Sequence, residues 1–240
     1  MVPGLETFLI EFPRMAVRPG VDGVVLLRGT FDFTAQRKGG ALITDSYAVS
    51  IRVPSRFPAD LPSVTELARK IPRDGKHHVN PDETLCLGAP LRLLRALSRE
   101  PTLVGFAHTC LVPYLYAISH KLRFGGPFVF DELAHGAKGV LLDYADLFKL
   151  RRPEQAEAVL RLLSMKKRRA NKLRCPCGCG RRVGACRLNV RLKEFRTLAG
   201  RPWFRAQVAQ IEDERRAKHH TARLTLRPAV LPRPEPAAVT

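Results

Sequence analysis

The sequence predicts an α+β protein in which an antiparallel β-meander flanked by helices is followed by a small helical module. Three observations indicate this fold class. Residues 23–53 contain two strand-like stretches joined by a glycine turn, which is typical of a hairpin. Residues 102–150 carry apolar residues at helical spacing. Residues 151–240 are strongly basic and contain four closely spaced cysteines, so we expect them to form a separate module.

The N-terminal elements are predicted as one helix followed by strands. Residues 5–12 fit a short helix, and residues 23–34 are rich in the β-branched and aromatic types that favour strands. A turn at Gly39-Gly40, where glycine tolerates positive φ, leads into residues 41–54, whose apolar and polar residues alternate. Residues 64–71 fit a last strand, although the sequence ELARK also suits a helical turn.

Helical patterns dominate the rest of the chain. Residues 102–122 predict a helix that Pro113 should kink or interrupt, and residues 130–150 predict a second helical segment. A further helix should run from Pro153 to Met165, because proline is favoured just inside a helix start. Two short amphipathic helices are expected after the cysteines, at residues 188–196 and 202–218.

The net charge of +19 is unevenly distributed along the 240 residues. Residues 1–150 hold 18 basic and 15 acidic side chains, whereas residues 151–240 hold 23 and 7. This excludes a uniformly basic protein that coats nucleic acid, but it allows the basic part to bind RNA, DNA or an acidic protein. We predict an enzyme-like domain at 1–150, a basic helical linker at 151–172, a basic module with the cysteines at 173–222, and a Pro-rich disordered tail at 223–240.

The chain is predicted to be cytoplasmic, with no membrane partner. It has no run of about 18 apolar residues that could form a transmembrane helix. The N-terminal apolar stretch contains Glu6 and Glu11 and lacks the basic region and cleavage site of a signal peptide. Disulfides are therefore not the expected state of the six cysteines.

Cys86 is the candidate nucleophile. It lies in HHVNPDETLCLG, between a polar stretch and a Gly-Ala-Pro turn, where a loop is expected. A thiolate both attacks and leaves readily, so an accessible cysteine can accept an acyl group and pass it on. His78 and Asn80 precede it by eight and six positions.

Together with the earlier FPADLP and the later TLVGFAHTCLVPYL, this stretch resembles the ubiquitin-conjugating (UBC) enzymes, in the form of their divergent bacterial branch. That family carries His-Pro-Asn shortly before its catalytic cysteine, which often sits in a Cys-Leu pair. The resemblance covers about residues 5–150 and implies a UBC-like fold. It implies that Cys86 forms a thioester with the C-terminus of a ubiquitin-like or other activated protein, that Asn80 stabilises the oxyanion or supports the loop, and that His78 braces the loop.

The resemblance also implies partners and leaves some points open. An upstream adenylating (activating) enzyme is expected, and proteins of this branch commonly share operons with such enzymes, including anti-phage systems. Val79 stands where the family has proline, the tryptophan that follows the cysteine in eukaryotic members is missing, and no acidic residue matches the one that helps to activate the lysine. The acceptor is therefore open between a lysine, a small amine and another cysteine.

Other interpretations of these residues stay in view. A papain-like hydrolase would pair Cys86 with His108, His120 or His135. A UBC-like scaffold without catalysis would use the C-terminal module to hold nucleic acid or a partner protein. Cys110, on the apolar face of a predicted helix, is interpreted as a core residue.

The second part of the chain contains a cysteine cluster. Its members follow the pattern Cys-x-Cys-x-Cys-x6-Cys and are Cys175, Cys177, Cys179 and Cys186. Thiolates repel one another unless a cation lies among them, and Zn²⁺ takes four of them in a tetrahedron. We therefore predict a structural zinc site, with an iron–sulfur cluster, a redox site or reactive surface thiols as the alternatives.

The cluster resembles the SEC-C zinc motif at the end of the secretion ATPase SecA, which reads Cys-Pro-Cys-Gly-Ser-Gly and then a further pair. Cys179 stands where that motif has serine. The second cysteine of the closing pair is missing, because Cys186 is followed by Arg187 and Leu188. The basic runs at 166–169 and 181–182 are either a solvated face or a partner surface. Nucleic acid is a candidate partner for residues 151–220, mainly through phosphates, because this region has few aromatic residues.

Overall fold

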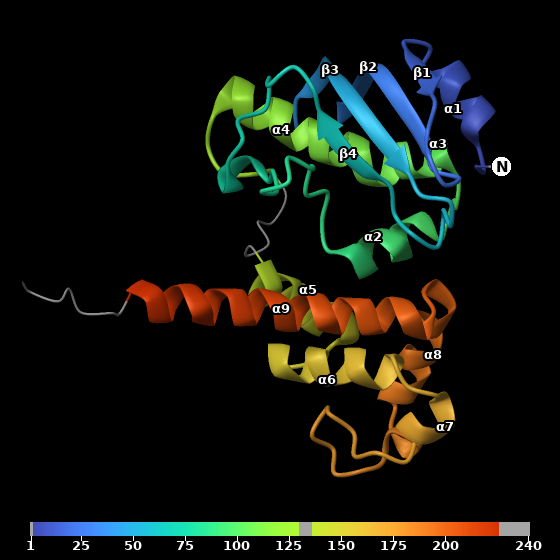
Figure 1. The fold of residues 1–240 in the computed structure, drawn as a ribbon, viewed down its shortest axis with the longest axis vertical. Helices are drawn as coiled ribbons and strands as arrows, with labels where there is room; N and C mark the ends of the chain where they lie inside the picture. Colours follow the sequence, from blue (N-terminus) through green and yellow to red (C-terminus); the bar gives the residue numbers. More distant parts are fainter. Residues whose placement is uncertain (1, 130–135, 226–240) are drawn as a thin grey trace, which may run out of the picture.

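The protein is described by a computed structural model that covers residues 2–129 and 136–225, with side chains described as far as Ala217. A short helix, α1 (Leu5–Glu11), leads into a four-stranded antiparallel sheet (Figure 1). The strands, in the order in which they lie side by side, are β1 (Met15–Arg18), β2 (Val25–Gln36), β3 (Leu42–Val53) and β4 (Ser63–Glu66). The predicted α+β class and antiparallel meander are confirmed.

The long hairpin of β2 and β3 forms the centre of the sheet. Phe31 pairs with Tyr47, and Leu27 pairs with Ile51. Because side chains in a strand alternate between the two faces, these paired residues lie on the same face, and all four are buried. The alternation in residues 41–54 therefore predicted the buried face correctly, whereas the short strand β1 was not predicted.

The last strand is shorter than expected. The prediction placed it at residues 64–71, but β4 ends at Glu66. The Glu66 carboxylate is buried and accepts hydrogen bonds from the backbone N–H groups of Ala68 (2.7 Å) and Ile71 (3.5 Å). The chain after β4 therefore turns around this side chain instead of continuing the strand.

Three consecutive helical segments run across one face of the sheet (Figure 1). They are α3 (Leu103–Phe106), the short π-helix η2 (Ala107–Leu111) and α4 (Val112–Phe124). Pro113 lies in the first turn of α4, directly after the π-helix. Proline has no backbone N–H to donate to the preceding turn of a continuous helix. The interruption predicted at Pro113 is therefore the π-helical segment that directly precedes α4.

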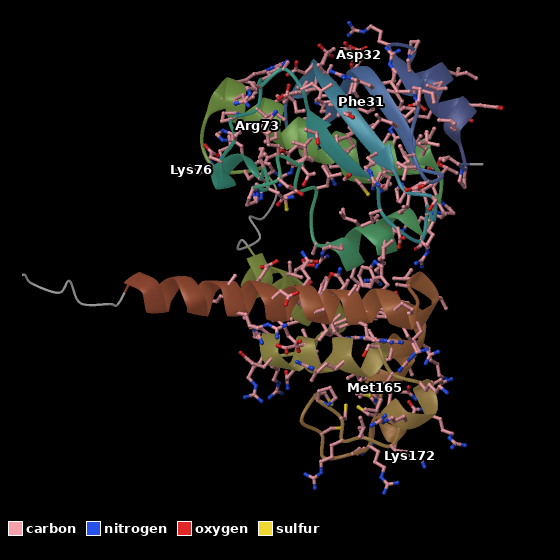
Figure 2. All side chains as sticks on the ribbon, viewed as in Figure 1. Phe31, Asp32, Arg73, Lys76, Met165 and Lys172 are labelled. Carbon is pink, nitrogen blue, oxygen red and sulfur yellow. The ribbon has the colours of Figure 1, made fainter. Side chains whose placement is uncertain are left out.

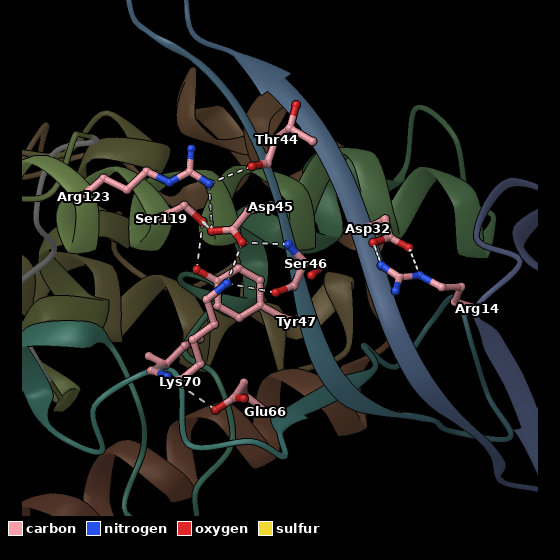
Figure 3. A network of polar contacts seen from close by, with 11 residues as sticks. Arg14, Asp32, Thr44, Asp45, Ser46, Tyr47, Glu66, Lys70, Ser119 and Arg123 are labelled. Carbon is pink, nitrogen blue, oxygen red and sulfur yellow. Dashed lines mark hydrogen bonds and ion pairs between the residues drawn. The ribbon is translucent and has the colours of Figure 1, made fainter.

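A polar network ties the sheet to α4 (Figure 3). The Asp45 carboxylate on β3 accepts hydrogen bonds from Ser119 on α4 (2.8 Å) and from Lys70. Burial alone would raise the pKa of Asp45, but these donors outweigh it and hold the pKa below its ordinary value. Tyr47 shares the hydroxyl of Ser119 at 2.8 Å, and burial raises its pKa to about 12. The network fixes α4 against β3 with its buried polar groups paired.

The remaining helices form a second hydrophobic core. They are α2 (Pro90–Leu97), α5 (Gly136–Phe148), α6 (Pro153–Leu163), α7 (Lys167–Ala170), α8 (Leu188–Leu198) and α9 (Arg201–Thr225). The rings of Phe148 on α5 and Phe195 on α8 meet edge to face, with centroids 4.8 Å apart. Within the described part of the chain, no helix has both the length and the apolar character needed to cross a bilayer.

The second core includes residues on the N-terminal side of residue 150, where the sequence predicts a domain boundary. Helix α5 belongs to the second core, where Tyr144 and Phe148 are buried. Within the predicted helical linker at 151–172, α6 buries Ala156, Val159, Leu160 and Leu163, which lie on one face of the helix. Helices α5 and α6 are joined by a short connection, so their apolar faces cover each other. Residues 223–225 of the predicted tail continue α9, and the rest of that tail lies outside the described residues.

Helix α2, which was not predicted, joins the two cores. Leu97 is buried in the first core, and Leu91 and Leu94 are buried in the second. The Arg92 guanidinium donates to the Asp143 carboxylate on α5 at 2.8 Å. This pairing fixes α2 on the second core, because the Asp143 side chain is only 4% exposed.

We expect Arg92→Ala to destabilise the protein by about 1–3 kcal/mol, since it leaves the Asp143 carboxylate buried without its ion pair. Arg95→Ala is the matched control on the same helix, because Arg95 pairs with Glu194 where both side chains are about half exposed. Its cost should stay below about 1 kcal/mol. Urea unfolding measures both variants, and equal losses would contradict the role given to Arg92.

Candidate functional site

Cys86 lies at the end of a tight hairpin that begins at His78. The Cys86 N–H donates to the His78 carbonyl at 2.8 Å, and the Asn80 N–H donates to the Thr84 carbonyl at 2.8 Å. The turn itself is closed by the Glu83 N–H, which donates to the Asn80 carbonyl at 2.9 Å. The structure therefore brings Cys86 and His78 together as paired neighbours, with Asn80 nearer the turn.

The hairpin is attached to both the sheet and the helix that covers it. The Leu85 N–H donates to the Val64 carbonyl of β4 at 2.7 Å, and Thr84 forms an antiparallel bridge with Thr65. From the other side, the Tyr114 hydroxyl on α4 donates to the His77 carbonyl at 2.9 Å. Backbone pairing on one side and a buried tyrosine on the other hold the loop in one position.

His78 occupies the left-handed region of the backbone, with φ of 53°. Its ring meets the Phe128 ring at an angle of 64°, with centroids 4.6 Å apart. Its carbonyl lies within 3.4 Å of the Tyr114 hydroxyl and also accepts the Cys86 N–H. This geometry suits the loop-bracing role that the resemblance implies for His78.

The Asn80 amide takes part in the turn. Its Nδ2 donates to the Thr84 hydroxyl at 3.0 Å, and that hydroxyl donates to the Asp82 carboxylate at 2.6 Å. One of the two Nδ2 hydrogens is thus engaged in supporting the loop. A carboxamide has a second hydrogen on the same nitrogen, so loop support does not consume its whole donor capacity.

The Cys86 thiol is half-buried, and burial raises its pKa above the ordinary thiol value, although the Gly88 backbone acts in the opposite direction. Burial also raises the pKa of Tyr114, and the neighbouring Cys86 raises it further. Cys86 therefore lies close enough to Tyr114 to disfavour ionisation of the tyrosine hydroxyl. At neutral pH both groups are protonated, so Cys86 rests as a neutral thiol.

The histidines considered for a papain-like site have other partners. His108 Nε2 lies 2.6 Å from the Glu11 carboxylate of α1. His120 packs against the Phe124 ring, with centroids 4.8 Å apart. Neither is paired with Cys86 in the portion that the structure describes, and His135 lies outside that portion. Cys110 is buried in the first core, as predicted.

The cysteine cluster is assembled by a second hairpin. The Cys175 N–H donates to the Arg181 carbonyl at 2.8 Å, and the Val183 N–H donates to the Leu173 carbonyl at 2.9 Å. Between them, Gly178 adopts φ of 83°, which a side chain would strain. This turn brings the first three thiols together, and the chain returns through η3 (Val183–Ala185) to supply the fourth.

The four sulfur atoms lie within 4.8 Å of one another, and none is in a disulfide. Cys175 and Cys177 are separated by 3.2 Å between sulfurs, and Cys186 lies 3.6 Å from both Cys177 and Cys179. A tetrahedral ion with metal–sulfur bonds of about 2.3 Å spaces its sulfurs by about 3.8 Å. The cluster can therefore hold a metal ion with small adjustments.

Backbone N–H groups point at these sulfurs. The Leu188 N–H donates to the Cys186 sulfur at 3.4 Å. The Arg181 backbone makes the corresponding contact with Cys179 and is the main reason why the pKa of that exposed thiol falls to about 7. Burial raises the pKa of Cys175, although the Cys177 backbone opposes this. Such donors stabilise thiolates, the form in which cysteine binds a metal.

Comparisons of this chain with protein-family models, with curated proteins and with solved structures return no match. The residues and their geometry are therefore the only basis for a functional assignment. The sequence singled out Cys86, His78, Asn80 and the four clustered cysteines, but it did not single out Tyr114. Tyr114 lies far from the loop in the sequence, so no local pattern indicates its contact with the His77 carbonyl.

Alkylation of Cys86 should follow the raised pKa of its thiol. Because thiolate is the reactive form, the rate with iodoacetamide should rise with pH through a midpoint above the ordinary thiol value of about 8.5. At pH 7.5 the rate should therefore be lower than that of a solvated model thiol. Site-resolved mass spectrometry measures it apart from the clustered cysteines, and a midpoint below the ordinary value would contradict the burial described here.

Removal of a bound metal should unfold the second core before the first, because Cys175 is packed within that core. A chelator should lower its free energy of unfolding by about 3 kcal/mol or more. Trp203 on α9, the only tryptophan, reports this core by fluorescence, while hydrogen exchange reports β2 and β3.

Elemental analysis provides the control for that experiment. Cys179→Ser should reduce the metal content from about one ion per chain, whereas Cys86→Ser should leave it unchanged. Protein that carries no metal, or a chelator that alters both cores equally, would refute the site.

Proposed function

We propose that this protein is a UBC-like conjugating enzyme in which Cys86 carries a ubiquitin-like modifier as a thioester. The observation that carries the proposal is the hairpin that joins Cys86 to His78 and presents the Cys86 thiol beside the edge of a four-stranded meander. The sequence resemblance around His78, Asn80 and Cys86 supports the same assignment.

The proposed reaction has two acyl transfers. In the first, Cys86 Sγ attacks the thioester carbonyl of a modifier carried by its activating enzyme. The new C–S bond forms, the old one breaks, and the Cys86 proton passes to the departing thiolate. In the second, an amine nitrogen attacks the new thioester, a C–N bond forms, and Cys86 leaves as a thiolate that receives a proton from the amine.

The roles of the neighbouring residues follow from their contacts. His78 and Tyr114 position the loop through its carbonyl groups. The second hydrogen of Asn80 Nδ2 is available to an oxyanion formed at the Cys86 acyl group. Since the resting thiol is neutral, the thiolate must form as the upstream partner docks or as the proton is handed on.

We infer that zinc is the metal of the cysteine cluster. Four thiols whose sulfurs lie within 4.8 Å of one another suit Zn²⁺ or an iron–sulfur centre, and Zn²⁺ with four protein ligands is the usual structural form. When bound, zinc supplies folding energy rather than chemistry, because no ligand position is left open. Cys175 and Cys177 would transmit that energy to the second core against which they pack.

A second candidate is a non-catalytic scaffold that keeps the UBC-like domain for binding. The raised pKa of the half-buried Cys86 favours it, because a neutral thiol is a poor nucleophile without activation.

The two candidates differ in an adduct assay. The full chain is mixed with a candidate activating enzyme, ATP and a candidate modifier. A conjugating enzyme should form an adduct that thiols cleave, that Cys86→Ala abolishes, and that Cys86→Ser converts into a thiol-resistant ester. Cys110→Ala, which removes a buried cysteine, should leave the adduct intact. An adduct that survives in Cys86→Ala would refute the proposal, and no adduct would favour the scaffold.

The same assay separates the two roles of Asn80. If the amide serves the oxyanion, Asn80→Ala should slow transfer to an amine by about 10²–10³-fold while the thioester still forms. Equal loss in both steps would assign it to loop support alone.

A further inference from the structure

We propose that the surface around the cysteine cluster binds the phosphodiester backbone of nucleic acid. The proposal does not depend on the chemistry of Cys86 and concerns the opposite end of the molecule. Figure 1 places α7 and the cysteine hairpin away from the sheet, beyond α6.

The first argument is unbalanced charge. Residues 158–193 contain no aspartate or glutamate. All eleven lysine and arginine side chains between Lys166 and Lys193 are exposed, and their nitrogen atoms extend outward around α7 and the hairpin (Figure 2). The nearest carboxylates in sequence are engaged elsewhere, since Glu157 pairs with Arg161 and Arg215, and Glu194 pairs with Arg95.

The second argument is that the metal site neutralises little of this charge. Zn²⁺ with four thiolates carries a net charge of about −2. That offsets a small share of the eleven cations in residues 166–193. Cations gathered without partners repel one another, so a surface of this kind lowers its free energy when an extended polyanion binds.

The third argument is shape. A groove of about 790 Å³ lies between the cysteine hairpin, the start of α8 and the end of α5. Its cationic lining consists of Lys149, Arg181, Arg187 and Arg191. The Arg191 guanidinium donates to the Phe148 carbonyl at 2.9 Å, which fixes one charge in the groove. Arginine offers paired donors that match phosphate oxygens.

The fourth argument distinguishes nucleic acid from an acidic protein. Residues 166–193 contain no aromatic side chain, and their most exposed large apolar residue, Val190, is one of the residues that line the groove. Protein interfaces commonly depend on aromatic anchors in a core depleted of charge. Phosphate recognition needs neither, and without stacking platforms it reads the backbone rather than the sequence of bases.

Binding of fluorescein-labelled 20-base-pair DNA and RNA duplexes to the metal-loaded full chain tests the proposal. Fluorescence anisotropy should show similar affinity for duplexes of unrelated sequence. The logarithm of the binding constant should fall linearly with the logarithm of the salt concentration, with a slope of about −0.9 for each phosphate contacted. Arg168→Ala/Lys172→Ala/Arg187→Ala should weaken binding about tenfold or more at 0.1 M salt and reduce that slope by about 2–3.

Arg28→Ala/Lys38→Ala/Arg52→Ala is the matched control, since it removes three exposed positive charges from the sheet and its hairpin. It should change the affinity less than about twofold. Equal weakening by both triple variants would overturn the proposal, because binding would then follow net charge alone. Absence of binding at 50 mM salt would also overturn the proposal. If polyglutamate competed as effectively as unlabelled duplex, the surface would be assigned to an acidic protein instead. Unchanged metal content and circular dichroism establish that the variants are folded.

Discussion

The outer edge of β4 needs hydrogen-bond partners, and the hairpin that carries Cys86 supplies them. The Leu85 N–H reaches the Val64 carbonyl, and Thr84 lies opposite Thr65. An unpaired edge would expose backbone groups to other chains, so this pairing has a structural purpose of its own. The position of the thiol follows from it, because Cys86 is the residue directly after the paired segment. The proposed chemistry thus depends on how the sheet ends.

The two ends of the molecule solve different physical problems. The first core has a sheet, a covering helix and paired polar groups such as Asp45 with Ser119. The second core consists of helices that bury apolar side chains against one another, and the glycine-rich cysteine hairpin packs against it. The four thiols of the hairpin lie within 4.8 Å of one another, so a bound metal would join the segments that carry them.

Much of the fold could be predicted from local pattern, because strands and helices bury faces with fixed periods. The alternation from Tyr47 to Val53 and the placement of Pro113 led to correct elements. Helix α2 could not be predicted this way. Its apolar residues are buried in two different cores, and its Arg92 pairs with Asp143 on α5, which is distant in sequence. For the same reason the contact of Tyr114 with the loop could not be predicted, because its partner His77 lies 37 residues earlier in the sequence. The candidate nucleophile and the cysteine cluster were found because their chemistry is local in sequence.

The place of α2 has a mechanical consequence. Only three residues separate Cys86 from Pro90, the start of α2, and that helix is fastened to the second core through Leu91, Leu94 and Arg92. Because this connection is short, the position of α2 limits where the thiol loop can lie. The helical core is thus linked to the loop that carries Cys86 through α2.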